Sequence, residues 1–530
     1  MRHTFTFLWL LVGFSMMAQA DLIWQEGYPS TGYLFLSGTN TVQTTFDSKG
    51  DIICNIPLDN YQDRQTIGLL KYDVDGNLLW SFRYNDTLAI SDHLNSMTLD
   101  SDDNIIVTGY SITKEEVDYD LIYLEGQGVA AKISSDGELL WRYILSGNDN
   151  YIPEYNHTIV DDENNIYITG RMANATGGVI TMEKLSPDGD FLYGFSNPDV
   201  EEGVIMQKRE DELTLLGINR GSSAYDMFVF DNNDVLIGQN TFDVLGNIAL
   251  KPTMDEEGSI YVTGGTGRFL ISKYDRLGNH LWTFEEPTNL PDNVFADELR
   301  RITFDEDKNL IVTGRHYGEN YGDPENYTNG DILTVQLSPD GEEMRRHRYI
   351  GVGDNNAEIG SDIIVYEDGS VFVAGTIFTG LGNPTDAFGL YLDENWEEAW
   401  TISYDYSGDK DDRVYDCLAV DNCIFTKGYS YVEGPVTSNH VLTKYDRTTA
   451  MKDINLVDFK IELFPNPFTQ RVSFSEEIQV LQVCNIDGKK VPFQQDGKGI
   501  SFNQELPAGK YYVSFVDEET GIQTQKILKL

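Results

Sequence analysis

The stretch "KYDVDGNLLW" at residues 71–80 joins an alternating apolar strand, a tight acidic turn and a second strand that ends in tryptophan. The chain repeats this pattern as "KISSDGELLW" at 132–141 and again as "KYDRLGNHLW" at 273–282. One such stretch predicts a β-hairpin. Its recurrence predicts a repeat architecture, in which each unit buries its apolar face against its neighbours.

The other half of the repeat is an acidic turn followed by an apolar strand that ends in glycine. It is written "DSDDNIIVTGY" at 100–110, "DDENNIYITGR" at 161–171 and "DEDKNLIVTGR" at 305–315. The closing glycines recur at a spacing of ~40–60 residues, typical of propeller repeats, at Gly109, Gly170, Gly217, Gly264, Gly314, Gly375 and Gly428. Four short strands per unit and no helical periodicity predict an all-β fold, a β-propeller.

Counting the units predicts eight blades, but the eighth unit lacks its last strand. The segment "DLIW" at 21–24 matches "NLLW" at 77–80, so we expect the N-terminal strand to complete the last blade and close the ring. Seven blades remain the alternative if the weak unit at 200–243 is an insertion. We expect the aromatic that ends each motif to wedge between neighbouring blades: Trp80, Trp141, Trp282 and Trp400, with Tyr193, Ile237 and Arg345 in the same register of weaker copies.

These motifs resemble the SBBP-type β-propeller repeats of secreted bacterial proteins, and the resemblance covers roughly residues 21–450. It implies a propeller over residues 21–453. It implies little about chemistry, because propellers carry many unrelated functions.

The N-terminus predicts export. "MRHTFTFLWLLVGFSMMAQA" at 1–20 has a basic start, an apolar run and a small-residue end, as a signal peptide cleaved near Ala20 does. No later stretch has the ~18 consecutive apolar residues of a membrane span, so we expect no transmembrane segment. Without a cysteine after the cleavage point, a lipoprotein anchor is not expected, and the predicted location is secreted or on the cell surface.

Residues 454–530 depart from the repeat. The prolines of "FKIELFPNPFTQRVSF" at 459–474 are incompatible with a helix. The rest of the segment alternates apolar and polar residues between glycine turns, which predicts a small β-sandwich. The segment resembles the type A C-terminal sorting domain of the Bacteroidota type IX secretion system. The residues that carry the resemblance are Pro465, Asn466, Pro467, Gly488, Gly509, Tyr511 and Lys526. It implies the type IX machinery as a partner, export across the outer membrane, removal of the tail, and either release or attachment to lipopolysaccharide. A generic adhesive Ig-like domain is the alternative.

The net charge excludes two classes of partner, and the cysteines leave one question about covalent structure open. A net charge of −48 and a pI near 4.2 argue against nucleic acid and against an anionic membrane surface. Cys417 and Cys423 flank a turn and could form a disulfide or stay as buried free thiols.

The acidic turns offer oxygens to calcium, but none supplies the twelve-residue ligand spacing of an EF-hand, and Asp and Gly are what tight turns require. The seven histidines form no zinc motif. No nucleophile elbow or P-loop occurs. We therefore predict no metal and no cofactor, with Ca²⁺ as the alternative, and no catalytic residue.

We expect a ligand to bind the face that carries the long, aromatic connections between blades, because loops on a rigid scaffold carry recognition. The candidate residues are Tyr119, Tyr123, Tyr151, Tyr155, His316, Tyr317, Tyr321, Tyr327, Tyr404 and Tyr406. The predicted function is binding or adhesion to a glycan or protein. One alternative is a secreted carbohydrate-active enzyme, a glycoside hydrolase or lyase, which two carboxylates and an arginine in the central funnel would favour. Another is a structural surface component.

Overall fold

The computed structural model describes most of the chain after residue 20. The described residues are 21–30, 43–60, 64–84, 89–118, 121–147, 152–174, 177–219, 224–244, 252–263, 269–286, 298–316, 330–351, 358–378, 385–404, 411–432, 437–447, 463–464, 471–474, 479–485, 491–496, 498–502, 509–517 and 521–529. The predicted signal peptide and Gly264 lie outside them. Residues 19–449 form one compact unit, and residues 450–530 belong to another.

Eight four-stranded antiparallel sheets make up residues 21–447. Sheets 1 to 4 consist of β2 (Thr44–Phe46), β3 (Ile52–Asn60), β4 (Arg64–Tyr72) and β5 (Leu78–Tyr84); β6 (Ser91–Leu99), β7 (Ile105–Asp118), β8 (Leu121–Ile133) and β9 (Leu139–Ser146); β10 (Ile152–Val160), β11 (Ile166–Asn174), β12 (Gly177–Leu185) and β13 (Phe191–Asn197); and β14 (Glu202–Lys208), β15 (Glu212–Ile218), β16 (Ala224–Asp231) and β17 (Leu236–Asp243). Sheet 4 is the weak unit of the repeat.

Sheets 5 to 8 continue the pattern, and sheet 8 takes its fourth strand from the N-terminus. They consist of β18 (Thr253–Met254), β19 (Ile260–Thr263), β20 (Leu270–Tyr274) and β21 (His280–Glu285); β22 (Glu298–Phe304), β23 (Leu310–His316), β24 (Asp331–Leu337) and β25 (Glu343–Tyr349); β26 (Glu358–Val365), β27 (Val371–Phe378), β28 (Thr385–Leu392) and β29 (Glu398–Tyr404); and β30 (Asp412–Val420), β31 (Cys423–Val432), β32 (Thr437–Asp446) and β1 (Asp21–Ser30). The described residues contain no helix, which confirms the all-β prediction. No apolar helix of membrane-spanning length therefore occurs in this part of the chain.

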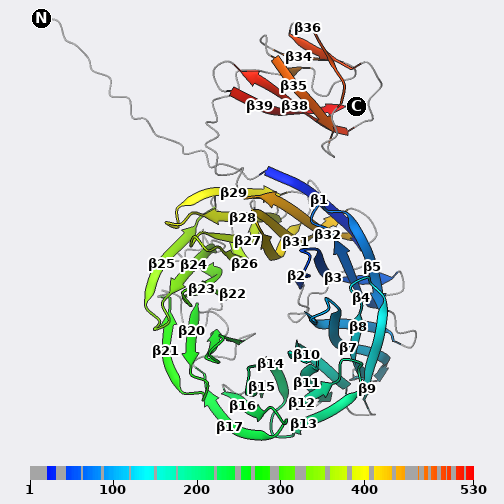
Figure 1. Ribbon diagram of the computed structural model, residues 1–530, viewed down its shortest axis with the longest axis vertical. Coiled ribbons are helices and arrows are strands. Elements are labelled where there is room, and N and C mark those ends of the chain that lie inside the picture. Colours follow the sequence, from blue (N-terminus) through cyan, green and yellow to red (C-terminus); the bar gives the residue numbers. More distant parts are fainter. Residues whose placement is uncertain are drawn as a thin grey trace, which may run out of the picture. The chain divides into compact units, whose positions relative to one another are not determined.

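The sheets follow one another around a ring, with the labelled first strands towards its centre and the last strands at its periphery (Figure 1). Sheet 8 lies beside sheet 1. Lys444 Nζ of β32 donates to the Val74 carbonyl at 2.6 Å, and Phe425 and Leu442 share a buried cluster with Ile52 of sheet 1. β1 pairs antiparallel with β32 and is the outer strand of sheet 8.

Three of the four tryptophans bind the next sheet, as the sequence predicted: Trp80, Trp141 and Trp282. Trp400 instead stacks on Tyr391 of its own sheet, with the ring centroids 5.0 Å apart. Trp80 Nε1 and Lys71 Nζ, from sheet 1, both donate to the Ser135 carbonyl in the last turn of sheet 2, at 3.0 and 3.2 Å. A Cβ on Gly137 of that turn would lie 2.7 Å from the Trp80 ring, so only glycine lets the indole close on the turn. The same donors reach the next turn at Trp141 and Lys132 with Pro187, and at Trp282 and Lys273 with Pro339.

One register prediction was wrong. Trp80 stands opposite Lys71, directly after a β-bulge, and Tyr193 and Arg345 hold the same place opposite Lys184 and Gln336. In sheet 4 that place belongs to Gly238, opposite Val229. Ile237 is instead the extra residue of the bulge, and it is exposed (59%). The same bulge occurs in every one of these sheets, so the spacing from the turn is constant: Gly238 follows Asp231 by as many residues as Trp80 follows Asp73, and Ile237 was assigned one position too early.

The acidic turns make the bonds that a turn interpretation requires. Asp47 Oδ1 accepts the backbone N–H groups of Lys49 and Asp51, both at 2.9 Å. The same pair of bonds recurs at Asp73, Asp100, Asp161, Asp231, Asp255, Asp275 and Asp393. Among the described residues, no group of three or more His, Cys, Asp or Glu side chains is placed to hold a metal ion.

The closing glycines of the repeat have a steric cause. A Cβ on Gly109 would lie 1.8 Å from the His93 carbonyl oxygen of the neighbouring inner strand, and one on Gly170 would lie 1.9 Å from that of Glu154. Any side chain there would push the two strands apart, so the repeat keeps glycine where the inner strand bulges towards it.

The second unit is described by itself. It contains a four-stranded sheet of β33 (Leu463–Phe464), β34 (Arg471–Phe474), β37 (Gly499–Ser501) and β36 (Gln494–Asp496), and a three-stranded sheet of β35 (Gln479–Asn485), β38 (Gly509–Asp517) and β39 (Gly521–Lys529). Gly509 and Tyr511 of the predicted sorting motif lie on β38 and Lys526 on β39. The other motif residues, Pro465, Asn466, Pro467 and Gly488, lie outside the described residues.

Candidate functional site

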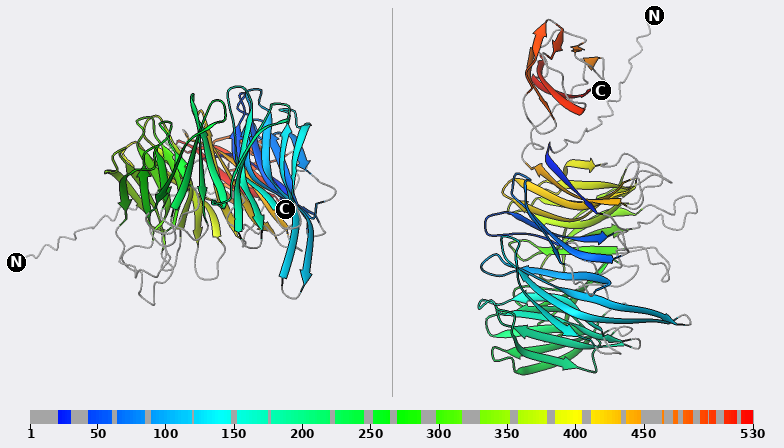
Figure 2. Two further views of the ribbon diagram at one scale, coloured as in Figure 1. Left: turned by 90° about the horizontal axis from the view of Figure 1, so that it is seen from below. Right: turned by 90° about the vertical axis from the view of Figure 1, so that its right-hand side faces the viewer.

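Most residues predicted to bind ligand fall on connections that the structure does not describe. Tyr119, Tyr151, Tyr317, Tyr321, Tyr327 and Tyr406 lie outside the described residues. Tyr123 lies on β8 and Tyr404 on β29. The connection that contains Tyr123 was predicted to be a long loop. Instead β7 and β8 stay paired as far as Asp118 and Leu121, and this hairpin extends beyond the ring in Figure 2.

Tyr155 is the first of two candidates whose side chains are described. Its segment was predicted to be a loop, but β10 already begins at Ile152. The Tyr155 ring is 1% exposed, and its hydroxyl donates to Glu183 Oε2 at 2.6 Å. Tyr155 therefore supports a neighbouring carboxyl group from within the core.

His316 is the second, and it is also buried (5% exposed). It stands opposite Asp331 across β23 and β24, and Arg348 forms an ion pair with that aspartate. Burial first, and then the charge of Asp331, raise the pKa of the nearby Glu358 to about 7. The structure thus brings His316 into a buried group of ionisable side chains.

The inner strands of sheets 6, 7 and 8 bring together an arginine and two aspartates. Arg301 Nε lies 2.8 Å from Asp362 Oδ1, and Asp362 Oδ2 accepts the Cys417 N–H at 2.8 Å. Arg301 is half-exposed, whereas Asp362 is buried. Burial, and then the adjacent Asp362, raise the pKa of Asp416. This is the grouping of residues that would favour the enzyme alternative.

Asp362 and Asp416 each directly follow the bulge of their inner strand, and the residues at this position in other sheets form structural hydrogen bonds. Each inner strand concerned has a bulge, and the residue after it faces the next sheet. Ser96 Oγ accepts the Thr158 N–H at 3.2 Å, and His157 Nδ1 accepts the Met206 N–H at 3.3 Å. Asp362 accepts Cys417 in the same way. These bonds tie neighbouring inner strands, which gives Asp362 a role in the fold itself.

The cysteines of sheet 8 are free thiols. Cys417 stands opposite Thr426 and Cys423 opposite Val420, so the two are offset along the hairpin and do not face each other. The sequence left open whether Cys417 and Cys423 form a disulfide, and in the structure they do not.

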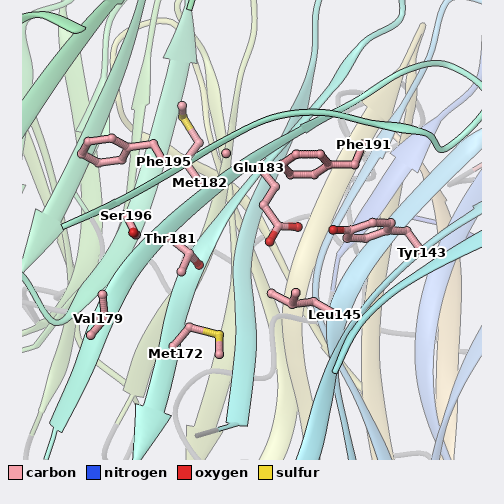
Figure 3. A pocket seen from close by; sticks show the side chains of 11 residues that line it. Tyr143, Leu145, Met172, Val179, Thr181, Met182, Glu183, Phe191, Phe195 and Ser196 are labelled. Atoms are coloured by element: carbon pink, nitrogen blue, oxygen red, sulfur yellow. The ribbon is translucent and has the colours of Figure 1, made fainter. Parts of the chain in front are cut away.

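An open cleft of about 640 Å³ lies between sheets 2 and 3. Tyr143 and Leu145 of β9 form one wall, and Phe191 and Phe195 of β13 line the other side. Glu183 of β12 lies between them. Figure 3 shows its carboxylate and the Tyr143 hydroxyl turned towards each other, between Phe191 and Leu145. The cleft is therefore mostly apolar, with one acidic group at its floor.

Glu183 is an unusual group to find there. It is 7% exposed, and burial raises its pKa even though hydrogen bonds from Tyr155 and Tyr143 act in the opposite direction. Burial and the adjacent carboxyl raise the pKa of Tyr143 to about 12. Both phenols therefore stay protonated at neutral pH and hold the carboxylate as donors. Perturbed acids in clefts are candidates for functional sites.

The cleft arises where sheet 3 departs from the repeat. Glu183 comes directly before Lys184, the repeat lysine opposite Tyr193, and the matching residue before Lys132 in sheet 2 is Ala131. The sequence analysis missed Glu183, although the signal was present as "EK" at 183–184 against "AK" at 131–132.

No protein-family model matches the sequence, and no curated protein matches it. Among solved structures, the chain is similar to a protein from Lactobacillus plantarum (16% identity, 72% of this chain and 100% of that one, TM-score 0.38). It is also similar to the periplasmic gluconolactonase of Pseudomonas aeruginosa (12%, 68% and 98%, 0.37) and to an ulvan lyase of polysaccharide lyase family PL25 (10%, 79% and 96%, 0.38). At these TM-scores the similarities carry no argument about function.

Proposed function

We propose that the protein is a secreted or surface-held binding module, built on a closed eight-bladed β-propeller that holds its ligand in the cleft between sheets 2 and 3. The observation that carries the proposal is the cleft itself, an open apolar volume with a single buried carboxyl group held by two phenols. Ligand sites are typically apolar hollows with a few fixed polar groups that orient the ligand.

The composition of the cleft favours recognition over hydrolysis. Glycoside hydrolysis uses two carboxyl groups, roughly 5–10 Å apart, one on each side of the bond to be cut. Among the described residues, Glu183 is the one acid that lines this cleft, and its phenol partners fix its position. The Glu183 carboxyl group is a fixed hydrogen-bond acceptor among aromatic and aliphatic side chains, and such an acceptor can orient a polar group of a bound ligand.

The test is a screen of the full chain, by biolayer interferometry, against panels of glycans, proteins and peptides. A binder should lose affinity on Phe191→Ala, which trims the exposed wall of the cleft. Leu192→Ala, its neighbour on β13 and similarly exposed, is the matched control. Loss of binding in the control alone, or binding that neither change affects, would contradict the cleft as the site.

The long-connection face is a second proposed location for a ligand, as the aromatic content of the connections predicts. Replacing Tyr317 and Tyr321 with Ala should weaken a ligand that binds there by ~0.5–1.5 kcal/mol for each stacked ring. The same ligand should then be indifferent to Phe191→Ala.

The rival function is a carbohydrate-active enzyme that uses Arg301, Asp362 and Asp416, since these residues form the grouping which that function requires. The hydrogen bond that Asp362 accepts from the Cys417 N–H of the next sheet weighs against this rival, because it gives Asp362 a structural role. Incubation with polysaccharides would decide: sugar release that Asp416→Asn abolishes without lowering the melting temperature would replace the binding proposal.

We further propose that β1 closes the ring and that the tail directs export. Pairing of β1 with β32 and the buried cluster shared by sheets 8 and 1 support the first point. The sorting-domain resemblance supports the second, with the type IX machinery as partner. Mass spectrometry of protein exported by the native host should find the residues after about 455 removed, and an intact "KILKL" end on that protein would contradict processing.

A further inference from the structure

The carboxyl group at the floor of the cleft has no basic partner among the residues that the structure describes. Glu183 accepts the Tyr155 hydroxyl, and the Tyr143 hydroxyl is its other hydrogen-bond partner. Within the described part of the chain, no Lys, Arg or His side chain forms an ion pair with it. A carboxylate has about four acceptor sites, so two phenols leave room for further donors. A positive charge placed beside a buried carboxylate offsets much of the free energy that removing the carboxylate from water costs.

The walls of the cleft suit the rest of such a ligand. Phe191 is 54% exposed, and its ring stands beside Glu183 in Figure 3. Met172, Leu145 and Val179 add flexible and aliphatic surface. Methionine adapts to varied apolar partners, and aromatic faces attract cations. A side chain with an apolar stem and a positive head would satisfy both the walls and the floor.

We propose, on the basis of the binding function proposed above, that the cleft receives a lysine or arginine side chain of a partner polypeptide. The alkyl stem lies between Phe191 and Leu145, and the charged head donates to Glu183. A volume of about 640 Å³ exceeds a single side chain, so apolar residues that flank the basic one enter as well.

Two observations favour a polypeptide over a glycan. Sugar hydroxyls need several polar side chains, whereas Glu183, Thr181 and Ser196 are the non-aromatic polar residues that line the cleft, among Leu, Met, Phe and Val. The net charge of −48 also attracts basic partners at long range.

The experiment selects peptides from a random display library on the full chain. We expect enrichment of a Lys or Arg flanked by apolar residues, and affinity that falls with rising salt. For a synthetic copy of the enriched peptide, replacement of the basic residue by norleucine should weaken binding at least about tenfold, as loss of a buried ionic partner does. Glu183→Gln should weaken binding to the same degree.

Matched variants keep the result interpretable. Glu138→Gln removes the same charge from an exposed turn of sheet 2 and should leave binding unchanged. Phe191→Ala changes an exposed ring, so it tests the site even if Glu183→Gln fails to fold. The inference is overturned if enriched peptides lack a basic residue, if no peptide is enriched, or if Glu183→Gln binds as well as the unaltered protein. Binding of a neutral glycan in the cleft, lost on Phe191→Ala, would overturn this inference while the proposed binding function stands. Failure of every panel would remove both.

Discussion

Sheet 2 has two interfaces that share one register but are filled differently. On the side of sheet 1, Phe82 and Tyr84 of β5 pack with Val129 and Ala131 in a continuous buried cluster. On the side of sheet 3, the matching places on β9 are held by Tyr143 and Leu145, and the cleft lies between these side chains and β12. We call the first the closed interface and the second the open interface.

The difference shows how a repeat acquires a site. Leu145 stands where the closed interface has the larger Tyr84, and Glu183 stands where it has Ala131. A smaller wall residue leaves space, and an acid gives that space a polar floor. At both interfaces a tryptophan and a lysine donate hydrogen bonds to a carbonyl in the last turn of the next sheet, so the contact between neighbouring sheets is maintained. The architecture therefore tolerates a departure at this one register.

The largest expected effect comes from placing an acid in the closed interface. Ala131 is fully buried (0% exposed), and Ala131→Glu adds a carboxyl group without a space or a phenol to hold it. We expect a loss of about 3–5 kcal/mol in the free energy of unfolding, the range for an uncompensated buried charge. Urea denaturation measures this loss. Leu140→Glu, at an exposed site of the same sheet, should change it by less than about 0.5 kcal/mol; equal tolerance of both changes would show that the interface is not closed.

The next effect concerns the inner strands and depends on pH. Burial and Asp362 raise the pKa of Asp416, so the folded protein binds that proton more tightly than the unfolded chain does. Its stabilising contribution is present at acidic pH and is lost as the pH rises through the raised pKa, by at most about 1.4 kcal/mol per pH unit. Asp416→Asn should therefore flatten the dependence of the melting temperature on pH between about pH 4, where an ordinary aspartate titrates, and about pH 7, the raised pKa of Asp416.

Asp100 provides the control for that window. Burial alone would raise its pKa, but hydrogen bonds from Lys132 and Asn104 lower it, so its contribution is lost only as the pH falls below the ordinary aspartate range. A melting curve for Asp416→Asn that follows the unaltered protein at every pH would contradict the assignment of the raised pKa.

A smaller effect of the same sign is expected in the open interface. Burial raises the pKa of Glu183, so its contribution to stability is also lost as the pH rises, although the two phenols offset part of the shift. Glu183→Gln keeps an acceptor for Tyr155 and removes the titration. The melting temperature of this variant should gain on that of the unaltered protein as the pH rises above the ordinary titration range of a glutamate. A constant difference would mean that the carboxyl group titrates as an exposed one does.

The smallest effect on stability should come from filling the cleft. Leu145→Tyr restores the side chain that Tyr84 supplies in the closed interface, into space that already exists. We expect a change of less than about 1.5 kcal/mol in unfolding free energy, as for tolerated core exchanges. Binding of the selected basic peptide should be lost at the same time. Full retention of binding would place the ligand elsewhere.

Sequence reasoning reached the all-β class because Trp80 and its copies repeat with their turns and lysines. It could not reach the bulges, since an extra residue on one strand leaves no mark in the letters. Ile237 was assigned the place of Gly238 because sheet 4 has no aromatic residue there to mark the position. Tyr155 was placed in a loop because polar neighbours hid a strand that starts at Ile152. Glu183 was within reach by aligning the repeats, but the space beside it depends on Leu145, in the neighbouring sheet and far away in sequence.

The central claim is that the open interface is the ligand site. Hydrogen–deuterium exchange of the full chain, with and without the selected lysine peptide, tests it most directly. The account predicts slower exchange in β9, β12 and β13 on addition of the peptide, no change in β4 and β5 of the closed interface, and no change anywhere with the norleucine analogue. Protection confined to other sheets, or equal protection by the norleucine analogue, would contradict it.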